Sequence, residues 1–156
     1  MFPTLGLVQT QAPNFHDIDW LLNVKDKIIP INKVYHVFRG SRRAWDALLN
    51  SMFTMFYIEA SGFGRGLGVL DVNKDSIANC YMLNPKPVSK DDRAKIIAAF
   101  EKLKSRQIMR VSEELSDDIR LEFEHTVLRS FGIDDYFEKI KSSLLSMQET
   151  RATVRE

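Results

Sequence analysis

The most distinctive stretch of this sequence is a glycine-rich segment that contains a single arginine. Glycines alternate with other residues at positions 62, 64, 66 and 68, and Arg65 lies between two of them. Because glycine lacks a Cβ atom, such a backbone can adopt positive φ values and approach another molecule closely. We therefore expect Gly64, Arg65 and Gly66 either to contact a nucleic-acid phosphate or groove, or to form a helix C-cap followed by a tight turn.

The glycine spacing does not fit a nucleotide-binding loop. The dinucleotide fingerprint requires glycines at its first, third and sixth positions, after a strand and at the start of a helix. Counted from Gly62, the sixth position is Leu67, and the stretch follows an apolar run of helical character. No Gly-Lys-Ser/Thr sequence follows, so the signature of a nucleoside-triphosphate loop is missing as well.

A second group of cations precedes the apolar run. Arg39 and Gly40 come before Ser41, a suitable N-cap for a helix that begins near Arg42 and Arg43. Free N–H groups in the first turn of such a helix also favour an anion. Because the guanidinium group fits phosphate or guanine, these arginines are candidate nucleic-acid contacts.

Lysines elsewhere in the chain can extend this surface. Lys33 and Lys74 would do so if the segments that carry them are neighbours in the fold. The alternative interpretation is a solvated helix start, or an ion pair between one of the arginines and Asp46, since exposed charge clusters are common. The sequence leaves both interpretations open.

Nucleophilic and metal chemistry have little support. The three histidines are scattered, and Cys80 has no histidine near it, which indicates a buried, unreactive thiol. Paired acidic residues fall at expected helix starts, where they complement the helix macrodipole. These pairs are Asp91/Asp92, Glu113/Glu114, Asp117/Asp118 and Asp134/Asp135. We predict no catalytic residue, no metal site and no cofactor for this chain.

Composition indicates an ordinary globular chain. Its 156 residues are 44% hydrophobic and 28% charged, with a net charge of +1, so any anion-binding surface must be local. One cysteine excludes an internal disulfide and is compatible with a reducing compartment. No secretory signal and no membrane span are expected, and we predict a cytoplasmic location.

The first half of the chain is predicted to combine short strands with one long helix. Strands are expected over residues 33–38, 69–72 and 80–83. The helix covers residues 42–60, and apolar side chains around most of its circumference indicate burial on more than one side. Gly62 is expected to end it in the left-handed conformation. A short helix over residues 19–27, stopped by Pro30, precedes these elements.

The second half is predicted to be helical. Ser89 and the acidic residues after it mark the start of a first helix, with apolar side chains at helical spacing through Ile108. A second helix begins near Asp117 and ends at Gly132, a third follows, and the tail from Glu149 is expected to fray. The sequence therefore predicts an α+β fold, with a mixed part over residues 1–87 and a three-helix tail over residues 88–156.

Four segments, in order, resemble the carboxy-terminal part of N6-adenine DNA methyltransferases of restriction–modification systems. These segments are HVFRGSRRAWD (36–46), ALLNSMFTMFYIEASGFGRGLGVLDVNKDSI (47–77), YMLNP (81–85) and LEFEHTVLRSFGI (121–133). The family consists of large single-chain enzymes with a target-recognition domain behind the methylase. The resemblance implies that this chain is a scaffold for that recognition region.

The resemblance also implies roles for particular residues. The arginine segment, which is Arg39, Gly40, Arg42 and Arg43, would open the recognition region. The helix formed by Leu48 to Ser51 would close it. The turn that follows would contain Gly64, Arg65 and Gly66.

The chain departs from the family pattern where catalysis occurs. The glycine motif for S-adenosylmethionine and the Asn/Asp-Pro-Pro-aromatic motif for adenine are both missing, since Asn84-Pro85-Lys86-Pro87 has a displaced second proline and no aromatic residue after it. The variable specificity segment is missing too, because RRAWD continues directly into ALLNS. S-adenosylmethionine is thus expected for the full-length family and not for this chain.

Two functions remain open from the sequence. The first is a non-catalytic module that contacts the phosphates of double-stranded DNA. The alternative is a protein-interaction or oligomerisation module, in which the helix over residues 45–60 exposes Phe53, Met55, Phe56 and Tyr57 to a separate methylase chain or a second copy. An independent methyltransferase is not supported, because no cofactor loop is visible.

Overall fold

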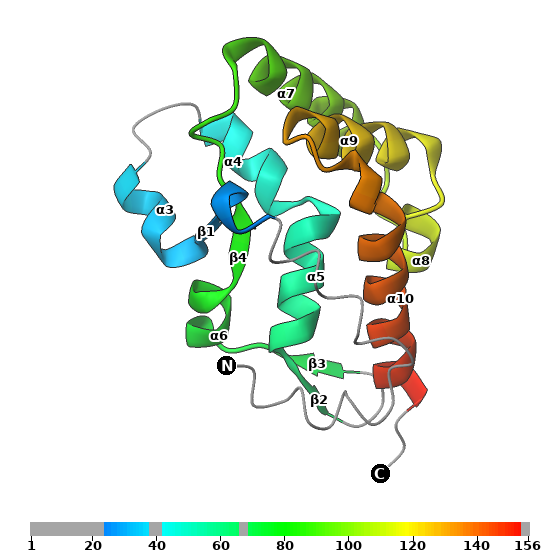
Figure 1. The fold of residues 1–156 in the computed structure, drawn as a ribbon. Coiled ribbons are helices and arrows are strands. Elements are labelled where there is room, and N and C mark those ends of the chain that lie inside the picture. The colour runs from blue at the N-terminus through cyan, green and yellow to red at the C-terminus, as the bar shows by residue number, and fades with distance from the viewer. Residues whose placement is uncertain (1–23, 38–41, 66–68, 154–156) are drawn as a thin grey trace.

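The computed structural model describes residues 24–37, 42–65 and 69–153. Helices dominate it, and two antiparallel pairs of short strands complete the fold (Figure 1). The predicted α+β class is confirmed. The expected helix over residues 19–27 lies mostly outside the described residues; its last three residues form a 3-10 turn.

The elements follow one another with short connections. In chain order they are η2 (Lys25–Lys27), β1 (Ile28–Pro30), α3 (Ile31–Val37), α4 (Arg42–Leu49), α5 (Met52–Ser61), β2 (Phe63–Arg65), β3 (Val69–Asp71), α6 (Lys74–Asn79), β4 (Tyr81–Leu83), α7 (Lys90–Lys104), α8 (Val111–Glu114), α9 (Asp118–Ser130), η3 (Asp134–Tyr136) and α10 (Phe137–Thr153).

The long helix expected over residues 42–60 is in fact two helices, α4 and α5, separated by an elbow at Asn50 and Ser51. Ser51 has an extended backbone, with ψ of 154°, and its hydroxyl accepts a hydrogen bond from the Thr54 N–H. The same hydroxyl donates to the carbonyl of Leu48 at 2.8 Å. Ser51 therefore ends α4 and caps α5. The apolar pattern concealed this break because it continues on both sides.

The strand expected over residues 33–38 is wrong, since residues 31–37 form α3. The strand role belongs to β1, immediately before it, which pairs with β4 in the register Ile28↔Leu83 to Pro30↔Tyr81. Pro30 is tolerated there because both strands of a two-stranded sheet are edges. The β-branched and aromatic residues of 33–37 favour a strand by intrinsic propensity, but tertiary pairing places the strand at residues 28–30 instead. The strands predicted over residues 69–72 and 80–83 are confirmed as β3 and β4.

The glycine-rich segment forms part of a hairpin, in which β2 pairs with β3 from Phe63↔Asp71 to Arg65↔Val69. Gly62 caps α5, because its N–H donates to the Ile58 carbonyl, but the left-handed conformation predicted for it is wrong: φ is −82°. The space beside Gly62 is nevertheless narrow. A Cβ atom at this position would lie 2.5 Å from Cδ1 of Leu70 on the opposite strand.

The three long helices predicted for the second half are confirmed as α7, α9 and α10. Ser89 caps α7, since its hydroxyl accepts from the Asp92 N–H at 3.1 Å, and Asp117 caps α9 in the same way. Gly132 has φ of 67°, the left-handed conformation expected at the end of α9.

Two details of the second half differ from prediction. The first helix stops at Lys104, so Ile108 lies in the following loop with 87% of its surface exposed. The helical run of α10 continues to Thr153 instead of fraying from Glu149. An ion pair explains this, because Nε of Arg151 lies 2.6 Å from Oε1 of Glu59 on α5.

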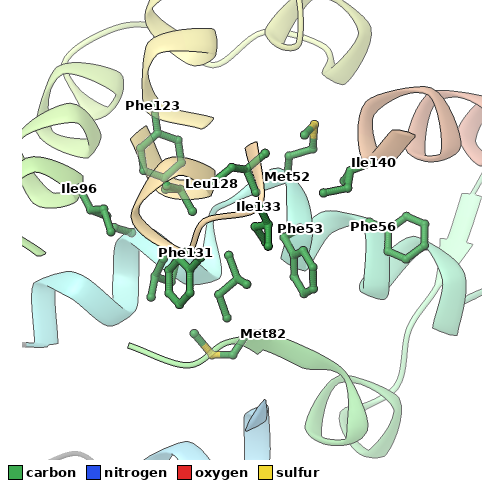
Figure 2. Close-up of a cluster of buried hydrophobic side chains, with 14 of the residues drawn as sticks. Met52, Phe53, Phe56, Met82, Ile96, Phe123, Leu128, Phe131, Ile133 and Ile140 are labelled. Atoms are coloured by element: carbon green, nitrogen blue, oxygen red, sulfur yellow. The ribbon is translucent and has the colours of Figure 1, made fainter. Parts of the chain in front are cut away.

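A single hydrophobic cluster joins the two halves of the chain (Figure 2). Met52 and Phe53 of α5 lie among side chains from β4, α7, α9 and α10, such as Met82, Phe123 and Ile140. α10 packs along α5, while α7 packs against both α4 and α9. α5 is thus packed on more than one side. Each large apolar side chain buried here contributes roughly 1.5–3 kcal/mol of transfer free energy.

The aromatic side chains of α5 are buried. Phe53, Phe56 and Tyr57 are 0%, 6% and 5% exposed, and Met55 is half-buried. The expectation that this helix exposes an aromatic patch to a partner is therefore wrong, because α10 and β4 cover it. Among the described residues, no helix is both long and apolar enough to cross a membrane.

Candidate functional site

Arg42 and Arg43 lie next to each other in the first turn of α4, and both side chains are exposed. Neither guanidinium group forms an ion pair with any residue that the structure describes, including the exposed Asp46. The predicted alternative, an internal pair with Asp46, is thus not seen in the described part of the chain. Two cations at a helix start can bind one anion together with the free N–H groups of that turn.

The opposite face of α4 fixes the position of these arginines. Ala44, Trp45, Ala47 and Leu48 are buried. This face packs against α7 and β4. The first turn of α4 is consequently presented outward by a helix that cannot rotate without exposing its apolar side chains.

The remaining predicted contacts are separated from Arg42 and Arg43. Gly64 and Arg65 lie in β2, beyond the far end of α5, and the exposed Lys74 begins α6 shortly after the hairpin (Figure 1). α5 alone spans about 15 Å at 1.5 Å per residue. The described structure brings Arg42 and Arg43 together and places Gly64, Arg65 and Lys74 in a second region.

Several predicted residues cannot be placed. Arg39, Gly40 and Gly66 lie outside the described residues. Lys33 can be placed: it is exposed on α3, which packs against α6, the helix that begins at Lys74. The segments that carry Lys33 and Lys74 are thus neighbours, as the prediction required, but both form helices and not strands.

The end of α5 next to the hairpin is fixed by the C-terminal helix. The guanidinium of Arg151 binds the carboxylate of Glu59 at two points, 2.6 Å from Nε to Oε1 and 3.2 Å from Nη2 to Oε2. The side chain of Glu59 is only 6% exposed. Since α10 also contacts β3, the hairpin is attached to the body of the fold through α10.

A buried ionic cluster was not foreseen from the sequence. It consists of Arg106, Glu114, Asp117, Arg120 and Glu124. Arg106 binds Glu114 through two parallel hydrogen bonds of 2.8 Å, and its Nε lies 3.2 Å from Oδ2 of Asp117. Glu114 was expected only to complement a helix start; it is instead 6% exposed and paired.

The other end of the ionic cluster reaches the elbow between α4 and α5. Nη2 of Arg120 lies 2.6 Å from Oε1 of Glu124 and donates to the carbonyl of Asn50 at the same distance. The N–H of Met52, in the first turn of α5, donates to Oε1 of Glu124 at 2.8 Å. The ionic cluster thus joins α8 and α9 to the elbow, across about seventy residues of sequence.

Opposite effects act on the two glutamates of the ionic cluster. Hydrogen bonds from Arg106 lower the pKa of Glu114, and the N–H of Met109 adds to them. Burial raises the pKa of Glu124, against the opposing effects of Arg120 and the Met52 N–H. Glu114 is therefore held in its charged form, while the site of Glu124 favours the proton.

The burial of Arg120 and Glu124 could have been predicted from their positions along α9. Arg120 and Glu124 are four residues apart, and they fall into the same helical repeat as the buried Phe123 and Val127. Two opposite charges on the apolar face of a helix indicate a buried pair. Glu114 has no comparable signal, because its partner Arg106 lies in an irregular loop.

The residues considered for nucleophilic or metal chemistry are dispersed. Cys80 is 1% exposed, and burial raises the pKa of its thiol, as expected for an unreactive cysteine. His125 lies on α9, with Nδ1 2.7 Å from Oδ1 of Asp134. Within the described residues, no group of three histidine, cysteine or acidic side chains is placed to hold a metal ion.

Comparison with known proteins identifies no family for this chain. No protein-family model, no curated protein and no solved structure matches it. The resemblance to adenine methyltransferases remains a prediction.

Proposed function

We propose that this chain is a non-catalytic DNA-associated module that contacts the phosphate backbone of duplex DNA through the first turn of α4. The observation that carries the proposal is the pair of adjacent, exposed arginines, Arg42 and Arg43, without an ion pair among the described residues. Guanidinium groups at a helix start are well suited to phosphate oxygens.

The proposed contact positions the protein without reading sequence. Phosphate contacts carry no base information by themselves. The net charge is only +1, so binding depends on a few local cations and not on the field of the whole molecule. Arg39, Gly40 and Lys33 would extend the contact from the segment before α4. Gly64, Arg65, Gly66 and Lys74 would form a second contact at the hairpin.

The motif order gives the proposal its biological setting. A recognition-region scaffold without an S-adenosylmethionine motif would act together with a methylase domain on a separate chain. We place this activity in the cytoplasm, where restriction–modification enzymes meet DNA. Methyl transfer itself is not assigned to this chain.

The test is a titration of the protein with a fluorescently labelled DNA duplex, followed by anisotropy at several salt concentrations. We expect affinity to fall steeply with salt, and Arg42→Ala and Arg43→Ala each to lower the slope of log K against log salt by about one. Arg110→Ala is the matched control, because Arg110 is an exposed arginine at the start of α8, on another side of the fold (Figure 1). No binding at low salt, or equal losses in all three variants, would refute the proposal.

The second candidate, a protein-interaction or oligomerisation module, requires an apolar side chain outside the core. Ile108 is 87% exposed on a loop whose backbone is held on both sides: Arg106 donates to the Gln107 carbonyl at 2.9 Å, and the Met109 N–H donates to Glu114 at 2.8 Å. In this alternative, Ile108 would lie at the contact with a second copy or a partner chain. Sedimentation velocity at high concentration tests this, since Ile108→Ser should abolish any self-association seen in the wild type.

A further inference from the structure

Glu124 lies where α9 meets the start of α5, and its two oxygens differ. Oε1 accepts from the Met52 N–H at 2.8 Å and lies 2.6 Å from Nη2 of Arg120. Oε2 is buried and has no hydrogen-bond partner among the described residues. The whole residue is 0% exposed. An ionised carboxylate in this position would leave one oxygen unsolvated, which is costly in a protein interior.

The charges of the ionic cluster are balanced without Glu124. Two guanidinium groups, Arg106 and Arg120, face two other carboxylates, Glu114 and Asp117. An ionised Glu124 would add a third negative charge, at the most buried point of the ionic cluster. A protonated Glu124 leaves the charges even and still accepts hydrogen bonds through Oε1.

We propose that Glu124 holds a proton in the folded protein at pH values where exposed glutamates are ionised, and that loss of this proton loosens the elbow between α4 and α5. Ionisation leaves Oε2 in need of a solvent molecule, and water can reach it only if the packing around it opens. The elbow is the affected point, because Glu124 binds the N–H of Met52 and its partner Arg120 binds the carbonyl of Asn50.

The groups that face Glu124 determine the direction of the effect. On α9 these are Arg120 and His125, both of which favour the charged form of Glu124, and on α5 the Met52 N–H does the same. Glu114 of α8 is the second carboxylate near Arg120, with Oε2 3.7 Å from Nη1. Arg106 pairs with Glu114 and with Asp117, and neither Arg106 nor Asp117 pairs with Glu124. In the described structure, no charged side chain of α7 or α10 is among the groups that shift Glu124.

Burial outweighs these attractions and raises the pKa of Glu124 above its ordinary value of 4.5. A raised pKa means that the folded state binds the proton more tightly than the unfolded state does. The contribution of Glu124 to stability is therefore greatest at low pH, and it declines as pH rises from about 4.5 through the folded-state pKa.

The experiment is an NMR titration of the side-chain carboxyl carbons in the full chain, with Glu→Gln variants to assign the signals. Glu122→Gln supplies the matched control, because Glu122 lies on the same helix, is half-exposed and pairs with Lys102. We expect the Glu124 carboxyl to titrate above the ordinary glutamate value of 4.5. We also expect the exchange protection of the Met52 amide, corrected for the intrinsic exchange rate, to fall across the Glu124 titration.

The control comparison makes the outcome decisive. In Glu124→Gln, protection of the Met52 amide should become independent of pH over that range, whereas Glu122→Gln should behave as wild type. If Glu124→Gln does not fold, the wild-type carboxyl is assigned through its own bonded atoms and the first measurement stands alone. A Glu124 carboxyl that titrates at or below the ordinary value of 4.5 overturns the proposal, as does Met52 protection that does not change across the Glu124 titration.

Discussion

The arginines of this protein occupy two contrasting environments. Arg42 and Arg43 are exposed at the start of α4 without an ion pair among the described residues, whereas Arg120 is 4% exposed and surrounded by carboxylates and carbonyls. The residue type is the same and its charge is the same. The difference teaches that the available partners, and not the arginine itself, decide whether a guanidinium group stabilises the fold or is available to a ligand.

The largest expected effect is the loss of Arg120. Arg120→Ala takes away one of the two guanidinium groups that face the buried Glu114 carboxylate, and it removes the hydrogen bonds to Glu124 and to the Asn50 carbonyl. Breaking a buried pair on one side costs about 3–5 kcal/mol, measured as the free energy of unfolding in urea. Arg129→Ala is the control, because Arg129 also pairs with a carboxylate but is 69% exposed; that change should cost at most about 1 kcal/mol. Equal losses in the two variants would contradict the comparison.

The second effect is a pH dependence that separates the two buried glutamates. The lowered pKa of Glu114 means that its contribution to stability is present above the ordinary value of 4.5 and is lost as pH falls through the folded-state pKa. Glu114→Gln should therefore weaken the loss of stability at acid pH. Glu124→Gln should instead weaken the decline of stability as the pH rises above 4.5. Urea denaturation at a series of pH values measures both. The same change of shape in both variants would show that the glutamates are not held in opposite forms.

An intermediate effect is expected at the C-terminal helix. Arg151 is partly exposed and forms two hydrogen bonds to the nearly buried Glu59. Its exposure is thus between that of the buried Arg120 and that of the exposed Arg129. Arg151→Ala should cost about 1.5–3 kcal/mol, as for a hydrogen bond to a charged group. Thermal unfolding measures this. A double variant with Glu59→Gln should be less destabilised than the sum of the two single changes, because the partners share one interaction.

Substitutions in the first turn of α4 should have the smallest effect on stability and the largest effect on the affinity for duplex DNA. The double variant Arg42→Ala, Arg43→Ala should change the free energy of unfolding by no more than about 0.5 kcal/mol, as for exposed positions without partners. The same variant should lose most of its affinity for duplex DNA at low salt. A clear loss of stability would show that these arginines have a structural role instead.

Helix caps were the most predictable features of this fold. Residue type and position alone predict that Ser89 and Asp117 cap the starts of helices and that Gly132 ends one, and the structure confirms each of these predictions. Local chemistry is sufficient because a cap involves only neighbours in the sequence. The α+β class followed from the same local signals.

Features that depend on distant contacts were missed. α3 was mistaken for a strand because the pairing of β1 with β4 could not be seen from residues 33–38. The elbow was missed because the apolar residues around Ser51 continue without interruption. In the candidate site, the sequence placed Arg42 and Arg43 at a helix start but left open whether they pair with Asp46, and the structure shows both side chains exposed. The burial of Glu114 depended on Arg106, in a loop without periodicity.

The ion pair between Glu59 and Arg151 has a consequence for biosynthesis. The two residues are 92 positions apart, and α10 lies along most of α5. While the chain is being made, α5 emerges from the ribosome long before the helix that covers it. We expect the apolar face of α5 to remain without its final cover until residue 151 has been synthesised, which makes this helix a natural target for chaperones on the nascent chain.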